Sequence, residues 1–137
     1  MLIRTSATAG PDVFEPMMAA QVSGVNAAAM KLALADVYQQ LLARAGVPEG
    51  APIPGTTARV IGYEVTDYRP AAGAAAVDVV LTSSDLGTGS RYLTFRLQLL
   101  WQGEDWRVVA PPGGDWASVA NTTAEPPPQL RYYGGGR

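Results

Sequence analysis

The stretch Arg91-Tyr-Leu-Thr-Phe-Arg-Leu-Gln-Leu-Leu-Trp101 decides the fold, because apolar and polar side chains alternate along it. Successive side chains of a β-strand point to opposite faces of the sheet, so residues at two-residue spacing share one face. The pattern therefore predicts a long antiparallel strand with one buried face. The apolar set on that face is Leu93, Phe95, Leu97, Leu99 and Trp101.

A second alternating run follows after a short polar connection. Residues 102–105 read Gln-Gly-Glu-Asp, and the alternation resumes from Trp106 to Ala110. Two alternating runs joined by a short polar turn with a glycine predict a β-hairpin. Pro111 and Pro112 end it, because proline has no N–H group to donate to a neighbouring strand.

The chain before this hairpin predicts helices and then two more strands. Asp12 and Glu15 have capping-box spacing, so a helix should begin near residues 11–13. Residues 23–26 interrupt the helical pattern, which leaves open whether 12–45 is one kinked helix or two; Gly46 and Pro48 end it. Residues 59–68 and 76–82 alternate as strands. We expect an α+β fold in which N-terminal helices pack on a curved four-stranded antiparallel sheet.

The expected domain boundaries follow from composition. Residues 1–11 should form a flexible N-terminus, and residues 12–120 a single α+β domain. Residues 121–137 are rich in proline and glycine and predict a disordered tail. Its triple proline could dock on a partner as a polyproline segment, although a plain flexible terminus is the commoner role for such a sequence.

Composition also limits the chemistry. The chain of 137 residues carries a net charge of -2 and has neither cysteine nor histidine. An acidic protein with dispersed arginines gives no reason to expect direct nucleic-acid binding. The usual metal ligands and the usual general base are absent from the sequence. We therefore expect no catalytic, cofactor-binding or metal-binding residues.

Two clusters of side chains nevertheless have to be weighed as functional candidates. Carboxylates and phenols could supply a base and a proton donor in a cavity, as in ketosteroid isomerase; the candidates are Asp67, Asp78, Asp85, Tyr63, Tyr68 and Tyr92. Against this, Asp78 lies on the polar side of its strand, and the other two acids lie at strand ends. Tryptophans could form a stacking platform, but core packing is their more usual role; they are Trp101, Trp106 and Trp116.

The hairpin over residues 101–109, a tryptophan, an acidic glycine-containing turn and then Trp-Arg-Val-Val, resembles the last hairpin of nuclear-transport-factor-two-like domains. With support from the helical region 27–45, the chain over residues 13–119 resembles more narrowly the actinobacterial proteins of conjugative elements. These proteins are similar to the VirB-eight family of type IV secretion systems and to the TcpC-type proteins of Gram-positive conjugation. The resemblance implies the cone-shaped arrangement of helices on a sheet.

That resemblance implies a non-enzymatic assembly domain of a conjugative DNA-transfer apparatus. Its partners would be other subunits of the transfer channel, with a homo-oligomer as a further possibility. It would lie on the extracytoplasmic side of the cell membrane, held by an anchor that this sequence does not contain. The alternative is a small-molecule-binding protein or isomerase of the same fold. We expect an interface on the outward face of the long strand, at Tyr92, Arg96 and Leu100.

Overall fold

The computed structural model describes residues 9–50, 53, 58–83, 86 and 88–133, and its chain forms two compact units. The first unit comprises residues 1–56 together with 107–115, and the second comprises residues 57–106 together with 116–137. Strand β5 (Asp105–Val109) contributes residues to both units. Two units therefore occupy the region where the sequence predicts one domain.

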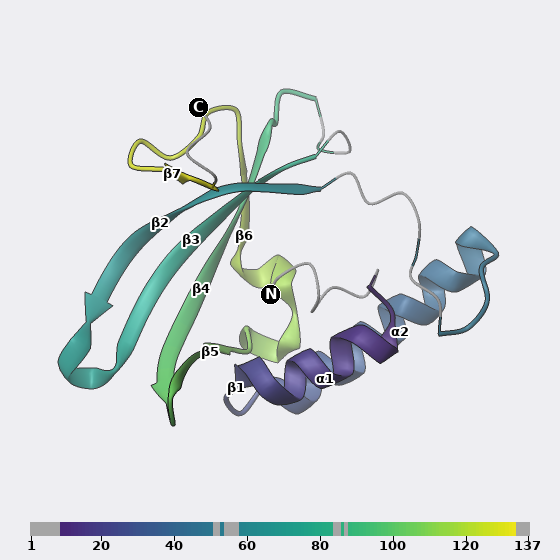
Figure 1. The fold of residues 1–137 in the computed structure, drawn as a ribbon. Helices are drawn as coiled ribbons and strands as arrows, with labels where there is room; N and C mark the ends of the chain where they lie inside the picture. Colours follow the sequence, from purple (N-terminus) through teal and green to yellow (C-terminus); the bar gives the residue numbers. More distant parts are fainter. Residues whose placement is uncertain (1–8, 51–52, 54–57, 84–85, 87, 134–137) are drawn as a thin grey trace. The chain divides into compact units, whose positions relative to one another are not determined.

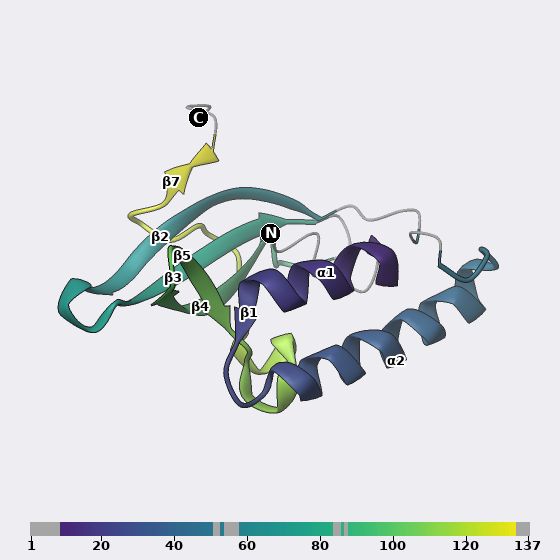
Figure 2. The same cartoon turned by 60° about the horizontal axis from the view of Figure 1, so that its bottom comes forward.

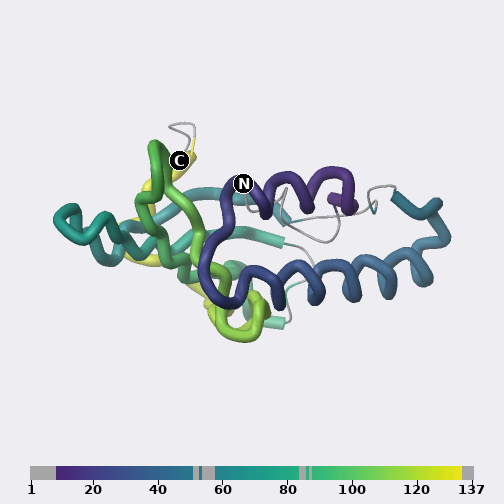
Figure 3. The backbone as a smooth tube through the Cα atoms, turned by 90° about the horizontal axis from the view of Figure 1, so that it is seen from below, coloured from purple at the N-terminus to yellow at the C-terminus, as the bar shows by residue number. Residues whose placement is uncertain are grey.

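The first unit contains two separate helices, which answers the question that the sequence left open. Helix α1 spans Pro11–Gln21 and helix α2 spans Ala27–Ala45. Figure 2 shows them side by side with the chain reversing between them, and Figure 3 shows the same pairing from below. The break between them contains Gly24, whose φ of 96° lies in the left-handed region that favours glycine.

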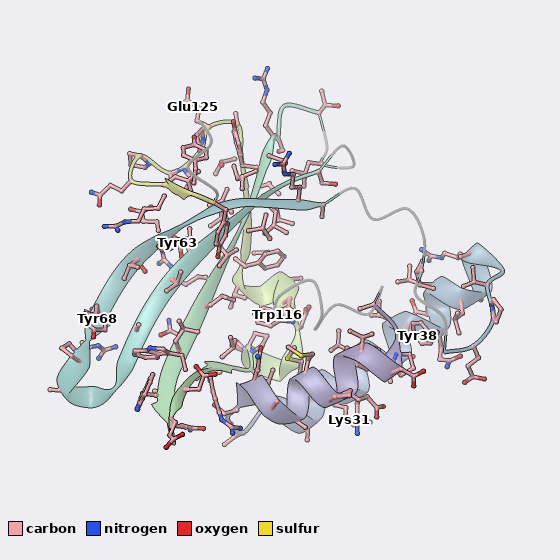
Figure 4. The ribbon with its side chains drawn as sticks, viewed as in Figure 1. Lys31, Tyr38, Tyr63, Tyr68, Trp116 and Glu125 are labelled. Carbon is pink, nitrogen blue, oxygen red and sulfur yellow. The ribbon has the colours of Figure 1, made fainter. Side chains whose placement is uncertain are left out.

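The start of α1 differs from the predicted capping box. The N-cap residue is Gly10, which offers no side chain, and Asp12 lies inside the first turn. A carboxylate at that position still interacts favourably with the positive end of the helix dipole. Glu15 forms an exposed ion pair of 3.7 Å with Lys31 of α2, and Figure 4 shows Lys31 on that helix.

The core of the first unit follows from four-residue spacing on both helices. Residues four apart lie on one face of an α-helix, so each helix presents one apolar stripe. The rings of Phe14 and Tyr38 meet edge to face, with centroids 6.3 Å apart. The buried hydrophobic residues that form the core of this unit are Phe14, Met18, Val22, Met30, Leu34, Tyr38, Val108 and Ala110.

Two short connections complete the first unit. Strand β1 (Val22–Ser23) pairs in parallel with the end of β5, with Val22 opposite Val108. The 3-10 helix η3 (Pro112–Gly114) lies against α2 so closely that a Cβ atom on Gly114 would collide with the backbone of Met30. Only glycine fits at this crossing.

The second unit is built on an antiparallel meander of three long strands, which Figure 1 shows side by side. They are β2 (Arg59–Arg69), β3 (Ala74–Thr82) and β4 (Tyr92–Gln102). These strands, and β5 after them, confirm the alternating runs predicted from the sequence. Strand β3 lies between the other two, and most of its side chains are buried on both faces.

The register of the meander defines a polar face and an apolar face. On the polar face Asp78 of β3 lies opposite Glu64 of β2 and Arg96 of β4. On the apolar face Val79 lies opposite Tyr63 and Phe95. The buried residues of the meander are Gly62, Ala75, Ala76, Asp78, Val79, Val80, Leu81 and Leu97.

The predicted four-stranded antiparallel sheet is wrong. Within the residues that the structure describes, the sheet has seven strands in the order β1-β5-β4-β3-β2-β7, with β6 (Ala120–Thr123) also paired to β4. The sheet is mixed, because β1 and β5 run in parallel. The strands that sequence analysis missed are β1, β6 and β7 (Arg131–Tyr132), which have two, four and two residues. Segments this short show no alternation from which a strand could be inferred.

The C-terminal region also differs from the expected tail over residues 121–137. Strand β6 pairs with Tyr92–Phe95 of β4, and β7 pairs with Gly62 and Tyr63 of β2. A Cβ atom on Gly62 would meet the backbone of Arg131, so glycine allows β7 to approach. Proline-rich composition thus did not prevent sheet pairing at both ends of this segment. Residues 1–8 and 134–137 of the predicted flexible ends lie outside the described residues.

Candidate interaction surface

The three predicted interface residues lie on the polar face of β4. Tyr92 pairs with Thr82 of β3, Arg96 with Asp78, and Leu100 with Ala74. Residues four apart on a strand are separated by about 13 Å, so the three side chains form a spaced row and not a cluster. Tyr92 and Leu100 are half-buried, and Arg96 is exposed.

Arg96 is held by an ion pair that sequence analysis did not find. Its Nε donates to Oδ1 of Asp78 and its Nη2 donates to Oδ2, both at 2.8 Å. The side chain of Asp78 is 11% exposed and that of Arg96 is 59% exposed. The hydrogen bond to Asp78, and then its charge, raise the pKa of Arg96 above its ordinary value. The guanidinium of Arg96 is therefore already engaged by a buried carboxylate and is less available to bind a partner protein.

Glu64 extends this pair into a charged row across three strands. It lies opposite Asp78 in the register, and its negative charge also raises the pKa of Arg96. Asp78 and Arg96 are 18 residues apart in the chain, and only the strand register brings them together. The alternation pattern correctly placed Arg96 on the polar face, but it contained no signal of the partner.

Three aromatic rings gather on the apolar face at one end of the meander, and we call them the aromatic end: Tyr68, Trp101 and Trp106. The rings of Trp101 and Trp106 meet edge to face with centroids 5.5 Å apart, and the rings of Tyr68 and Trp106 are 6.5 Å apart. Tyr68 is 60% exposed and Trp101 is 50% exposed. Figure 4 shows Tyr68 at the end of β2 beside the turn into β3. Two exposed rings, those of Tyr68 and Trp101, are therefore grouped at one place.

Local turns hold these rings in position. Between β2 and β3 the 3-10 helix η2 (Pro70–Ala72) is followed by Gly73, whose φ of 57° is left-handed. The carbonyl oxygen of Gly73 accepts a hydrogen bond of 2.7 Å from the backbone N–H of Trp101. A second turn at Gly103 leads from β4 into β5 and returns the chain to Trp106. The cluster thus rests on hydrogen-bonded backbone.

The third tryptophan lies elsewhere in the second unit. The ring of Trp116 packs edge to face on Phe95, with centroids 6.2 Å apart. Figure 4 labels Trp116 away from Tyr68. The structure thus brings together two of the three tryptophans that were considered as a stacking platform. The third ring beside them is that of Tyr68, which sequence analysis weighed only as one of three possible proton donors.

The candidate acid–base residues are not gathered into one site. Asp67 forms an exposed ion pair of 2.9 Å with Arg69 on its own strand. The ring of Tyr63 packs against Tyr133 at 5.6 Å. Asp85 lies outside the described residues. Both carboxylate oxygens of Asp78 accept hydrogen bonds from Arg96, so the two described candidate acids pair with different arginines.

The described part of the chain offers neither a cluster of metal ligands nor a membrane-spanning helix. Among these residues no three histidine, cysteine, aspartate or glutamate side chains are grouped so as to hold a metal ion. In the same residues, neither helix is both long enough and apolar enough to cross a bilayer.

Comparison with known families assigns the chain. A family model described as a domain of unknown function, DUF8175, matches residues 7–126. The chain belongs to the DUF8175 family. A search of curated proteins and a search of solved structures gave no match. The matched part of this DUF8175 domain includes the charged row, the aromatic end and residues of both units.

Proposed function

We propose that this DUF8175 domain is a non-enzymatic interaction domain that binds a partner protein through its aromatic end. The observation that carries the proposal is that Tyr68 and Trp101 are exposed while ring contacts and turns hold them in place. Tryptophan and tyrosine are enriched among the residues that dominate binding energy at interfaces. A ring that is already ordered loses little conformational entropy on binding.

The charges beside the aromatic end indicate the chemistry of the partner. Glu104 and Asp105 lie in and after the turn that precedes Trp106, and both are exposed. Complementary charges guide association and select partners. The partner surface should therefore offer an apolar pocket for the rings, with basic side chains at its border.

The proposal extends to a place in a conjugative DNA-transfer apparatus. Its support is the resemblance of the hairpin over residues 101–109, which contributes two of the three rings. In this role the domain contacts other channel subunits on the extracytoplasmic side of the membrane. It binds no nucleic acid directly, which agrees with the net charge of -2.

The carboxylates support a role in binding rather than in catalysis. An isomerase of the type considered above needs a carboxylate that is free to accept a proton from a substrate. Asp78 is committed to Arg96, and Asp67 is exposed and paired with Arg69. No observation in the described residues favours the isomerase alternative.

A crosslinking experiment tests the proposed contact. A photo-crosslinking phenylalanine replaces Trp101 in the full chain, which is expressed in its own host and irradiated. We expect a defined adduct with a partner protein, because the side chain at this position is exposed at the proposed contact. The same replacement at Gln98, which is exposed on the polar face of the same strand, serves as the matched control. Charge reversal by Glu104→Lys with Asp105→Lys should reduce the adduct.

The outcomes separate the two parts of the proposal. Absence of an adduct, or the same adduct from both positions, contradicts binding through the aromatic end. If the adduct forms, Trp101→Ala is introduced into a donor cell and DNA transfer is measured at an unchanged protein level. Reduced transfer supports the place in conjugation, whereas unchanged transfer removes that place and retains the interaction.

A further inference from the structure

The outer edge of β2 is covered over only part of its length. β7 pairs with Gly62 and Tyr63, and within the ranges that the structure describes no strand pairs with residues 64–69 on the side away from β3. Figure 1 shows this part of β2 at the border of the sheet. An edge strand presents backbone N–H and C=O groups that can pair with a further strand. We call residues 64–69 the open edge.

The open edge combines exposed apolar side chains with three charged residues and a bulge. Natural proteins use charged side chains (especially lysine), proline, bulges or very short strands to prevent pairing at an edge. Residues 64–69 contain neither lysine nor proline. Val65 is 47% exposed and Tyr68 is 60% exposed, both on the apolar face. Apolar side chains thus flank a backbone that is open to pairing.

A bulge determines which side chains of the open edge share a face. The register with β3 shifts between Val65 and Asp67. As a result Glu64, Asp67 and Arg69 lie on the polar face, while Val65 and Tyr68 lie on the apolar face. In a regular strand residues 64 and 69 would point to opposite faces, because side chains alternate with period two.

The bulge therefore places the two ends of the segment on the same face. The first and last residues, Glu64 and Arg69, carry opposite charges, and the second and fifth residues, Val65 and Tyr68, share the apolar face. Two copies aligned antiparallel about a point between Thr66 and Asp67 would place Glu64 opposite Arg69, and Val65 opposite Tyr68. Both pairs would match in face and in chemistry, and each would occur twice by symmetry.

We propose that the protein forms a symmetric dimer in which the open edge pairs antiparallel with the open edge of a second copy. Charge complementarity selects this occupant, because the segment fits its own sequence. In the alternative register centred on Asp67, the Asp67 side chains of the two copies would lie directly opposite each other. Val65, on the apolar face, would then lie opposite Arg69, on the polar face. Like charges directly opposite each other destabilise a strand pair. The inference is independent of the proposed function.

Existing contacts of these residues do not prevent the pairing. The ion pair between Asp67 and Arg69 is exposed, with the two side chains 47% and 65% accessible. Exposed ion pairs contribute little free energy, so Arg69 can exchange Asp67 for Glu64 of the second copy. Backbone hydrogen bonds provide most of the affinity when one strand is added to another.

Charge reversal tests the dimer. The variants are Glu64→Arg and Arg69→Glu, each made in the full chain, and dimerisation is measured by sedimentation over a concentration series. Each variant alone should dimerise about tenfold more weakly or worse, because every charged pair becomes a pair of like charges. An equal mixture of the two should recover wild-type affinity as a heterodimer, since the introduced arginine then faces the introduced glutamate and the native pair remains. Native mass spectrometry identifies the heterodimer.

Arg44→Glu is the matched control, because it makes the same charge change on the exposed side of α2. It should dimerise as the wild type does. A wild type that stays monomeric throughout the series, a control as weak as Arg69→Glu, or a mixture no stronger than its components overturns the proposal.

Hydrogen exchange of the wild-type protein provides a second test of the dimer, without any substitution. Amides of residues 64–69 should exchange more slowly as concentration rises; exchange that is independent of concentration also overturns the dimer.

Discussion

At the scale of single residues, Asp78 depends most on its neighbours. Among the described residues it is the charged side chain that is buried. Removing a carboxylate from water is unfavourable unless hydrogen bonds and an opposite charge compensate. The guanidinium of Arg96 provides both, while its own side chain remains largely exposed to solvent. The two partners should therefore respond differently to mutation.

We predict that Arg96→Ala lowers the free energy of unfolding more than Asp78→Ala does. The first change leaves a buried carboxylate beside Glu64 with no cation, at a cost of about 1–3 kcal/mol. The second leaves an arginine that water can solvate. Urea denaturation of both variants and of the double variant measures the difference. Equal losses, or a larger loss for Asp78→Ala, would show that solvent reaches the carboxylate.

A second residue-scale prediction concerns the apolar face of β4. Leu97 is buried and Gln98, its neighbour on the other face, is exposed. Leu97→Ala should lower the free energy of unfolding by about 2–5 kcal/mol, because a cavity remains where the side chain was. Gln98→Ala should have little effect. Similar denaturant midpoints for the two variants would mean that the faces of β4 are assigned the wrong way round.

At the scale of elements, the crossing of η3 and α2 depends on a residue without a side chain. Gly113 and Gly114 both have positive φ, at 64° and 73°. A Cβ atom on Gly113 would meet nothing within 4 Å, whereas one on Gly114 would collide with the backbone of α2. The two glycines thus share backbone strain and differ in packing.

Substitution by alanine separates these effects. Gly113→Ala should lower the free energy of unfolding by about 1–2 kcal/mol, the cost of a left-handed residue with a side chain. Gly114→Ala should cost more than about 3 kcal/mol, because η3 must also move away from α2. Thermal unfolding of both variants measures the contrast. Closely matching transition temperatures would mean that η3 does not lie against α2 in solution.

The helices and strands differ in how well they can be predicted from the sequence. Strands β2, β3 and β4 and the helical character of residues 12–45 were predictable, because long segments repeat their apolar period several times. Whether that region forms one helix or two was not. β1 and β7 were not, because two residues show no period and their pairing depends on partners far along the chain.

The candidate sites follow the same rule. The two-residue alternation of side chains was enough to place Tyr92, Arg96 and Leu100 on one face. The ion pair of Arg96 with Asp78 and the ring contact of Tyr68 with Trp106 could be found only from the way the strands pair. The bulge in β2 is a local feature that alternation cannot reveal. Sequence therefore located the faces, and the structure was needed to find what meets on them.

At the scale of the whole molecule, the second unit carries two distinct surfaces. The aromatic end offers exposed rings beside an acidic turn, and the open edge offers backbone groups beside complementary charges. Tyr68 belongs to both surfaces, on β2 next to the turn into β3. Pairing of two open edges would bring two copies of the aromatic end onto one sheet. A dimer of this kind would present paired binding sites, which raises the avidity for a partner that is itself repeated.

The parallel pair of β1 and β5 has a consequence for the order in which the chain folds during synthesis. Val22 pairs with Val108, so 108 − 22 = 86 residues separate the partners. Strands β2, β3 and β4 pair with neighbours along the chain and close short loops, which favours rapid folding. The first unit, in contrast, needs residues 107–115, which leave the ribosome after the entire meander. A released chain that ends before residue 107 would contain the three strands of the meander but would leave β1 without its partner.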